Sequence, residues 1–177
     1  MQGTALVHRM RLTAWFSKGD IKAGKSPPDF AGSIKVGDHF YPILFDAKSF
    51  AGDRWDFSEW RATAKKRHQL KALRDMAAFG GLAFALVRQN SLSTATGATV
   101  DAKTGPYHYF DYPAWLVPLE NIENHARCDV WSMAAKEMNY NPEGLMLNSR
   151  TFPIRGANWL PAAILYAEEQ QRERQSK

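Results

Sequence analysis

Cysteine is almost absent from this sequence, since Cys128 is the only one in 177 residues. A single thiol excludes an internal disulfide and any zinc site built from several cysteines. We expect Cys128 to be a buried or unreactive thiol in a reducing cytoplasm. The sequence also has no long apolar run, so it predicts no transmembrane helix. Arg9 and Arg11 lie where a secretion signal needs its apolar segment, which argues against export.

Two further absences exclude large enzyme classes. The sequence has no glycine-rich loop followed by a lysine, the motif that cradles nucleotide phosphates, and no nucleophile elbow of the α/β-hydrolase type. Four of its five histidines, His8, His39, His108 and His125, show no metal-ligand spacing. Hydrophobic residues make up 45% of the chain, which is enough for a core, and the length suits one domain over residues 1–177.

Charge is distributed unevenly along the chain. Residues 1–75 contain 14 Lys and Arg against 8 Asp and Glu, which gives a net charge of +6. Residues 76–177 contain 9 against 10, which gives −1. A basic half favours a polyanionic partner. For a cytoplasmic protein, nucleic acid is the leading candidate.

The residue pattern predicts an α/β domain with a mixed sheet and a crossover helix. Ser58 suits the start of a helix that Gly80-Gly81 ends, and an apolar run follows as a buried central strand. Extended segments are expected over residues 3–16, 29–35, 41–48, 82–87 and 106–118, the last as an edge strand or a strand followed by a loop. Helices are expected over residues 58–79, 129–138 and 158–173, with a flexible loop at 90–105 and a frayed tail at 170–177.

Two acidic residues and a lysine are expected to converge on neighbouring strands. Asp29 stands at the start of one strand and Asp46 near the end of the next, with the Gly37-Asp38 turn between them. Asp46 and Lys48 are two residues apart, so their side chains lie on the same face of a strand. Asp46 also follows four apolar residues, a costly place for a carboxylate unless a cation compensates its charge.

This combination of groups suits phosphodiester hydrolysis. Carboxylate oxygens are ligands for Mg²⁺, which polarises the phosphate and neutralises charge in the transition state. A lysine beside the metal can orient or help deprotonate the attacking water, and it can stabilise negative charge. The alternative is that Asp46 and Lys48 form an ordinary surface ion pair, because an Asp-x-Lys sequence on a strand is common.

Five short motifs follow one another in order within roughly residues 3–118. They are Asp29-Phe30-Ala31-Gly32, Phe45-Asp46-Ala47-Lys48, His68-Gln69, Gly80-Gly81 and Ala83-Phe84. This order and spacing resembles the RecU-type Holliday-junction resolvases of the PD-(D/E)xK nuclease superfamily. That family carries an Asp-Phe/Tyr-x-Gly strand, a Phe-Asp/Glu-Ala-Lys strand, a His-Gln on the following helix, then Gly-Gly and an apolar strand.

The resemblance implies a restriction-endonuclease-like fold and a homodimer with two active sites. Each site would nick one of two opposed strands of a four-way DNA junction, with Mg²⁺ or Mn²⁺ as cofactor. Carried onto this chain, the resemblance makes Asp29, Asp46 and the backbone carbonyl of Ala47 metal ligands. Lys48 would orient or help deprotonate the attacking water, and Gln69 would contact the site or the scissile phosphate.

The resemblance also implies a projecting β-hairpin, or stalk, over residues 9–27 that enters the junction centre. Here the hairpin is basic, as phosphate contact requires. Trp15 and Phe16 would stack on open bases or pack against the partner subunit. The basic run at residues 65–67 would contact the DNA backbone or form a solvated face. The predicted DNA-binding residues are Arg9, Arg11, Lys18, Lys22, Lys25, Lys65, Lys66 and Arg67.

One departure from the family pattern concerns an active-site glutamate. The family begins with a helix that bears this residue, whereas this chain has no Glu before Glu59. The expected explanations are a start upstream of Met1, a substitute such as Asp20 or Asp38, or reduced activity. A Mg²⁺ site tolerates replacement of one protein ligand by water. The rival hypotheses are another PD-(D/E)xK nuclease and a non-catalytic protein that binds junctions during recombination.

Overall fold

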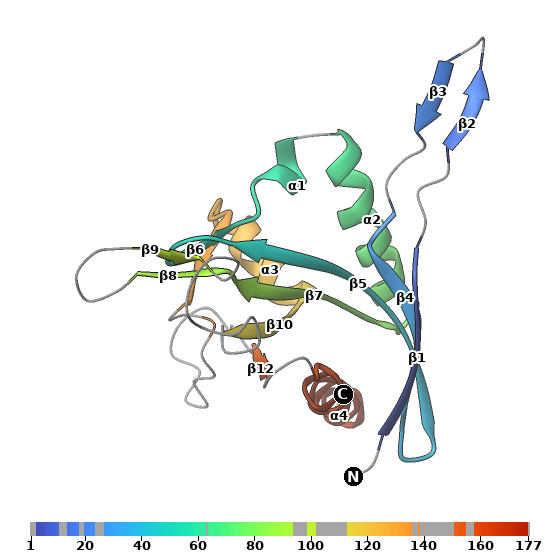
Figure 1. Ribbon diagram of the computed structural model, residues 1–177. Coiled ribbons are helices and arrows are strands. Elements are labelled where there is room, and N and C mark those ends of the chain that lie inside the picture. Colours follow the sequence, from blue (N-terminus) through green and yellow to red (C-terminus); the bar gives the residue numbers. More distant parts are fainter. Residues whose placement is uncertain are drawn as a thin grey trace.

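A computed structural model describes most of the chain. The described residues are 3–10, 14–17, 20–23, 27–62, 64–93, 99–101, 113–135, 138, 151–154 and 158–176. Within them a mixed sheet of six strands lies between helices (Figure 1), so the predicted α/β class is confirmed. No helix in these ranges combines the length and the apolar composition needed to cross a membrane.

The strand order of the main sheet is β1–β4–β5–β7–β10–β12. β1, β4 and β5 pair antiparallel, and Gly37 in the β4–β5 turn has a φ of +59°, which favours glycine. β5 pairs parallel with β7, which pairs antiparallel with β10, and β10 with β12. The bounds are Gly3–Arg9 for β1, Phe30–Val36 for β4, His39–Phe50 for β5, Leu82–Gln89 for β7, Ala114–Pro118 for β10 and Phe152–Ile154 for β12.

A helical crossover joins the parallel strands β5 and β7, as parallel pairing requires. It contains α1 (Glu59–Ala62) and α2 (Ala64–Ala78), and α2 is followed two residues after its end by Gly80, whose φ of +82° suits glycine. Between β5 and the crossover lies β6 (Arg54–Asp56), which is outside the main sheet and pairs with β11 (Ser132–Ala134).

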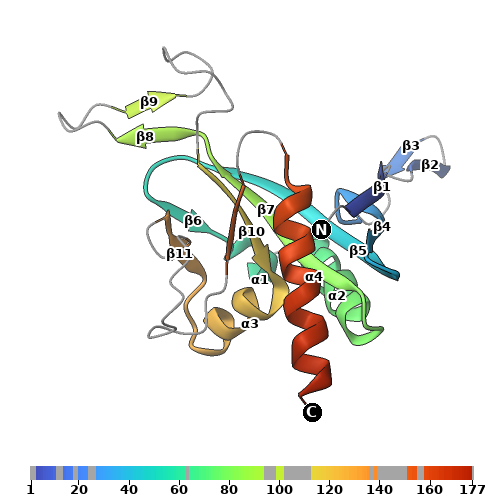
Figure 2. The ribbon, with the colours of Figure 1, turned by 90° about the horizontal axis from the view of Figure 1, so that it is seen from below.

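Alternation along β5 divides the core into two clusters. Leu44 and Phe50 face a cluster that includes residues of α2 and of α3 (Leu119–Arg127). Ile43 and Phe45 face the opposite cluster, to which α4 (Leu160–Gln175) contributes its small and aromatic residues. Figure 2 shows α4 lying across the sheet, on the face opposite to α2 and α3. Any polar side chain in the Leu44–Phe50 row therefore lies beneath α1 and α2.

A separate hairpin projects beyond β1 and β4, away from the main sheet (Figure 1). It consists of β2 (Ala14–Ser17) and β3 (Asp20–Ala23), which pair antiparallel. A hairpin within residues 9–27 is thus present in the backbone. The side chains of these strands lie outside the described part, so the basic character of the hairpin remains a prediction.

The structure corrects the prediction of a helix over residues 129–138. That segment contains β11, whose pairing with β6 is a contact between residues far apart in the sequence. The strand at the end of segment 106–118 is not an edge strand, because β10 has neighbours on both sides. The predicted helix at 158–173 is present as α4, which continues through Gln175, and the fraying of residues 170–177 stays a prediction.

Two further predictions were wrong in detail. Segment 90–105, expected to be a flexible loop, contains the short paired strands β8 (Ser91–Ser93) and β9 (Thr99–Asp101). For Cys128, the alternative of a buried thiol is wrong, because Cys128 is exposed at the end of α3, and the alternative of an unreactive thiol stays a prediction.

Candidate active site

The site forms where β4 separates from β5. The ladder between the two strands ends at the pair Phe30–Phe45, while β5 continues to Phe50 alongside β7. Asp29 immediately precedes β4 at this divergence. Its carboxylate Oδ2 accepts a hydrogen bond of 3.0 Å from the backbone N–H of Ala47, so the side chain replaces the missing strand partner.

The backbone carbonyl of Ala47 faces the same opening. In a β-strand the N–H and the C=O of one residue point to the same edge, and the Ala47 N–H points to Asp29. Ala47 is exposed, so this edge is open to solvent. The predicted carbonyl ligand therefore lies on the Asp29 side of β5.

Asp46 and Lys48 lie on the face of β5 that α1 and α2 cover. They occupy the row between Leu44 and Phe50, both members of the apolar core cluster on that face. Asp46 is fully buried, and the side chain of Lys48 is 15% exposed. Lys48 Nζ lies 2.5 Å from Asp46 Oδ2 as an ion pair. Asp46 Oδ1 has no hydrogen-bond partner within the described ranges, which is costly for a buried carboxylate.

The environment of Asp46 opposes its negative charge. Burial raises its pKa from the ordinary value of 3.8 to about 6, and the neighbouring Asp29 carboxyl adds to the rise. The positive charge of Lys48 lowers the pKa of Asp46, but it does not offset the burial. The carboxylate is therefore short of positive charge even with its lysine partner in place.

Lys48 is held as an ammonium. Burial alone would lower the pKa of Lys48, but the negative charges of Asp46 and Asp29 outweigh that effect and raise it. Its Nζ also lies 5.9 Å from the centre of the buried Trp60 ring on α1, within cation–π range. Lys48 is thus suited to donate hydrogen bonds and to stabilise negative charge, rather than to remove a proton.

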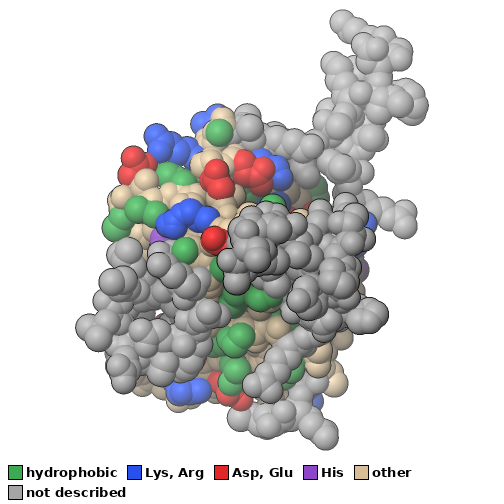
Figure 3. All heavy atoms as spheres, turned by 60° about the vertical axis from the view of Figure 1, so that its left-hand side comes forward, with side chains coloured by type: hydrophobic (Ala, Val, Ile, Leu, Met, Phe, Trp, Pro, Cys, Tyr) green, Lys and Arg blue, Asp and Glu red, His purple; other side chains and the backbone are tan. Residues whose placement is uncertain are grey.

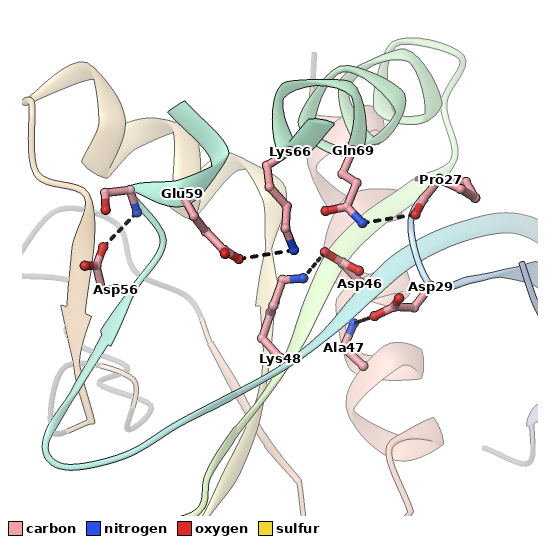
Figure 4. Close-up of polar contacts among 10 residues, drawn as sticks. Pro27, Asp29, Asp46, Ala47, Lys48, Asp56, Glu59, Lys66 and Gln69 are labelled. Atoms are coloured by element: carbon pink, nitrogen blue, oxygen red, sulfur yellow. Dashed lines mark hydrogen bonds and ion pairs between the residues drawn. The ribbon is translucent and has the colours of Figure 1, made fainter. Parts of the chain in front are cut away.

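Helix α2 brings two more polar side chains to the site (Figure 4). Gln69 is 2% exposed, and its Nε2 donates a hydrogen bond of 3.0 Å to the carbonyl of Pro27. Its Oε1 has no hydrogen-bond partner in the described part of the chain. Lys66 Nζ lies 3.5 Å from Glu59 Oε1, and its side chain extends towards Asp46 and Lys48. Gln69 therefore also anchors the segment that leads into Asp29.

These residues fit a hard divalent cation. Asp29, Asp46 and the Ala47 carbonyl all offer oxygen, the ligand atom that Mg²⁺ and Mn²⁺ prefer. No group of three or more His, Cys, Asp or Glu side chains converges among the described residues. Two carboxylates and a carbonyl are nevertheless compatible with Mg²⁺, which commonly uses one or two protein carboxylates and keeps several waters. The buried Asp46 carboxylate would gain the positive charge that it lacks.

The predicted DNA-binding residues divide into three groups. Arg9 and Arg67 are exposed, and Lys66 is half-buried at the site. Arg11, Lys18 and Lys25 lie outside the described residues. Lys22 on β3 and Lys65 on α2 lie in described backbone, but their side chains are not described. The sequence had treated Lys66 and Arg67 alike, whereas the structure gives them different surroundings.

The inward position of Lys66 is what the sequence interpretation missed. Residues 66, 69, 70 and 73 are spaced as one face of a helix, and three of them are buried as Gln69, Leu70 and Leu73. That spacing was a usable signal, and it would have separated Lys66 from its basic neighbours.

A comparison of the sequence with protein-family models and with curated proteins finds no match. The assignment of a class to this protein therefore depends on the five sequence motifs and on the geometry of the site.

Proposed function

We propose that this protein is a divalent-metal-dependent DNA endonuclease of the PD-(D/E)xK class, with a restriction-endonuclease-like fold. One observation carries the proposal. A fully buried carboxylate, Asp46, shares the point of strand divergence with Asp29, the Ala47 carbonyl and the Lys48 ammonium. An ordinary surface ion pair would not be buried in the apolar row of a central strand.

The chemistry is hydrolysis of a phosphodiester. Water adds to phosphorus, one P–O ester bond breaks, and the products are a phosphate monoester and an alcohol. A bound Mg²⁺ or Mn²⁺ would supply Lewis-acid polarisation and charge neutralisation. Asp29, Asp46 and the Ala47 carbonyl would hold this ion. Lys48 donates hydrogen bonds to the attacking water or to a phosphate oxygen, and so stabilises the charge that develops.

Within this class we infer a resolvase of the RecU type that acts as a homodimer on four-way junctions. The projecting β2–β3 hairpin and the basic N-terminal half of the sequence support this narrower proposal. A basic hairpin would contact phosphates at the junction centre. Two copies of the site would each nick one of two opposed strands.

Cleavage assays test the proposal. We would incubate a four-way junction, a flap and a linear duplex of matched arm sequence with the protein, in Mg²⁺, in Mn²⁺ and in EDTA. The wild-type protein should nick the junction fastest, and only with metal. Asp46→Asn and Lys48→Gln should each slow cleavage at least about 100-fold. Ser49→Ala, an exposed position on the other face of β5, is the matched control and should retain the wild-type rate.

The three substrates and the two site variants separate the possible outcomes. Equal rates on all three substrates would retain the nuclease class and contradict junction selectivity. Normal cleavage by either site variant would contradict the site assignment.

A second candidate function is junction binding without catalysis. It is favoured by the absence of a third carboxylate from the site among the described residues. Tight, salt-dependent binding of the junction without cleavage in either metal would support this candidate over the first.

A further inference from the structure

Lys66 occupies a position on α2 that normally holds an apolar residue. It belongs to the face formed by Gln69, Leu70 and Leu73, and its side chain is only 27% exposed. A lysine on an inward face is costly unless its ammonium is paired. The basic residues on the outer face of the same helix avoid this cost because their side chains are exposed.

The outer cations of this region are paired with surface acids. Lys71 contacts Asp75 at 2.6 Å, Arg74 contacts Glu123 at 2.5 Å, and the exposed Arg61 of α1 contacts Asp129 at 2.7 Å. Figure 3 shows Lys and Arg side chains lying beside Asp and Glu side chains on one face of the molecule. These cations are therefore largely neutralised by neighbours, and none of these partners is a residue of the site.

Lys66 differs from the outer cations in both distance and direction. Its contact with Glu59 is longer, at 3.5 Å, and the Glu59 side chain is itself 48% exposed. Figure 4 shows the Lys66 side chain extending between Glu59 and the Asp46–Lys48 pair. Glu59 is therefore an exposed partner of Lys66 at the edge of the site, and the contact between them is longer than the ion pairs of the outer cations.

We propose that Lys66 is a further phosphate-contacting residue of the active site, which exchanges Glu59 for the DNA backbone when substrate binds. A count of charges supports this exchange. Without a metal, the three carboxylates of Asp29, Asp46 and Glu59 outnumber the two ammonium groups of Lys48 and Lys66 by one charge. A divalent cation adds two positive charges, so the site then attracts an anion such as a phosphodiester.

This inference rests on the proposed nuclease function and deepens it. Lys66, the inward-facing lysine of the basic run at residues 65–67, would contact the phosphate at the reacting centre. Arg67 lies on the outer face of the helix. The competing explanation is structural: Lys66 would serve only as a counter-ion that keeps α1, α2 and the buried acids together. The two explanations predict opposite effects on metal affinity.

The experiment compares Lys66→Gln with Lys66→Arg and with Lys71→Gln, which removes an outer lysine from the same helix. Mn²⁺ affinity is measured by calorimetry without DNA, and cleavage is measured in single turnover at saturating Mn²⁺. Lys66→Gln should bind Mn²⁺ at least about threefold more tightly, because a repelling positive charge is removed. It should nevertheless cleave about 10- to 100-fold more slowly. Lys66→Arg should keep at least about a third of the rate, and Lys71→Gln should resemble the wild type.

Two results would overturn the inference. One is cleavage by Lys66→Gln at the rate of Lys71→Gln. The other is slower cleavage together with weaker Mn²⁺ binding, which indicates a structural role. If the wild-type protein binds Mn²⁺ but cleaves no DNA, the proposed nuclease activity is contradicted, while the inference about Lys66 is still open to test. In that case the affinity of each variant for the four-way junction is measured. Lys66→Gln must weaken this affinity at least about threefold more than Lys71→Gln does.

Discussion

At the scale of single residues, Asp46 is a charged group in a place that opposes charge. It is fully buried, its Oδ1 has no hydrogen-bond partner among the described residues, and its pKa is raised to about 6. Such a group lowers the stability of the metal-free protein at neutral pH. A binding site often carries this kind of cost, because the ligand that relieves it is bound more tightly.

Asp46→Asn should therefore stabilise the metal-free protein. The folded pKa of Asp46 lies above its ordinary value of 3.8, so the destabilising effect is absent below about pH 4 and complete above about pH 6. In EDTA at pH 7.5 we expect Asp46→Asn to gain about 1–3 kcal/mol in free energy of unfolding. Urea unfolding at several pH values measures this gain, which should shrink as the pH falls towards 4.

Asp56→Asn provides a control of opposite sign. Asp56 is exposed, and hydrogen bonds from Ser58, chiefly from its backbone N–H, lower the pKa of Asp56. Its charge therefore favours folding at neutral pH, and Asp56→Asn should not gain stability there. A loss of stability in Asp46→Asn at pH 7.5 would contradict our account of the buried carboxylate.

The sequence predicted the convergence of the strand residues of the site, because strand geometry is regular. Side chains two residues apart share a face, and a turn between antiparallel strands aligns their ends. The roles assigned to these residues remain predictions. Lys66 was predicted to contact DNA, but its inward position was not predicted, because a run of three basic residues looks the same whether one of them faces inward or all face solvent.

At the scale of elements, close packing of backbones explains two of the sequence motifs. A Cβ on Gly32 of β4 would collide with the backbone of β1 at Leu6 and Val7. A Cβ on Gly81 would press against the Met76 side chain and the carbonyl of Pro42. Glycine is thus required where β1 crosses β4, and again where α2 turns into β7 beneath β5.

Gly32→Ala should move β1 away from β4 and lower the free energy of unfolding by about 1–3 kcal/mol. The effect arises because the obstructing atoms are backbone and cannot rotate away. Chemical denaturation measures the loss. Ser33→Ala on the same strand is the matched control, with an expected change within about 0.5 kcal/mol. Equal stability of Gly32→Ala and Ser33→Ala would contradict the close approach of β1 and β4.

Elements with strong local signals were predicted well, and elements set by distant contacts were not. The main crossover helix is marked by its terminal glycines, and β7 by its apolar run. α3 was not predicted, because it follows Pro118 without a side-chain cap and buries the polar residues Asn121 and His125. β11 depends on pairing with β6, which no local pattern indicates.

At the scale of the whole molecule, the sheet separates the site from a second core. Tyr166 of α4 packs edge-on against Phe84 at 6.3 Å between ring centroids and donates a hydrogen bond of 2.9 Å to Glu120. The contact between Tyr166 and Phe84 lies on the face of the sheet opposite to Asp46, and the hydrogen bond to Glu120 joins α4 to the start of α3. Changes in this layer should therefore affect folding without altering the chemistry of the site.

Tyr166→Ala should lower the free energy of unfolding by about 3–5 kcal/mol, the usual cost of removing a large buried aromatic side chain. The fraction that remains folded should bind Mn²⁺ within about twofold of the wild-type affinity, because distant sites act independently. Urea unfolding measures the loss of stability, and calorimetric titration below the unfolding transition measures the Mn²⁺ affinity. A large loss of metal affinity in the folded protein would contradict the separation of the two layers.

Calorimetric titration of the apo protein with Mn²⁺ at pH 7.5 tests the divalent-ion site most directly. We predict one site per chain in the wild-type protein and in Ser49→Ala. We predict that the binding heat disappears in Asp46→Asn while that variant stays folded. Undiminished Mn²⁺ binding by folded Asp46→Asn, or no binding by the wild-type protein, would contradict the account.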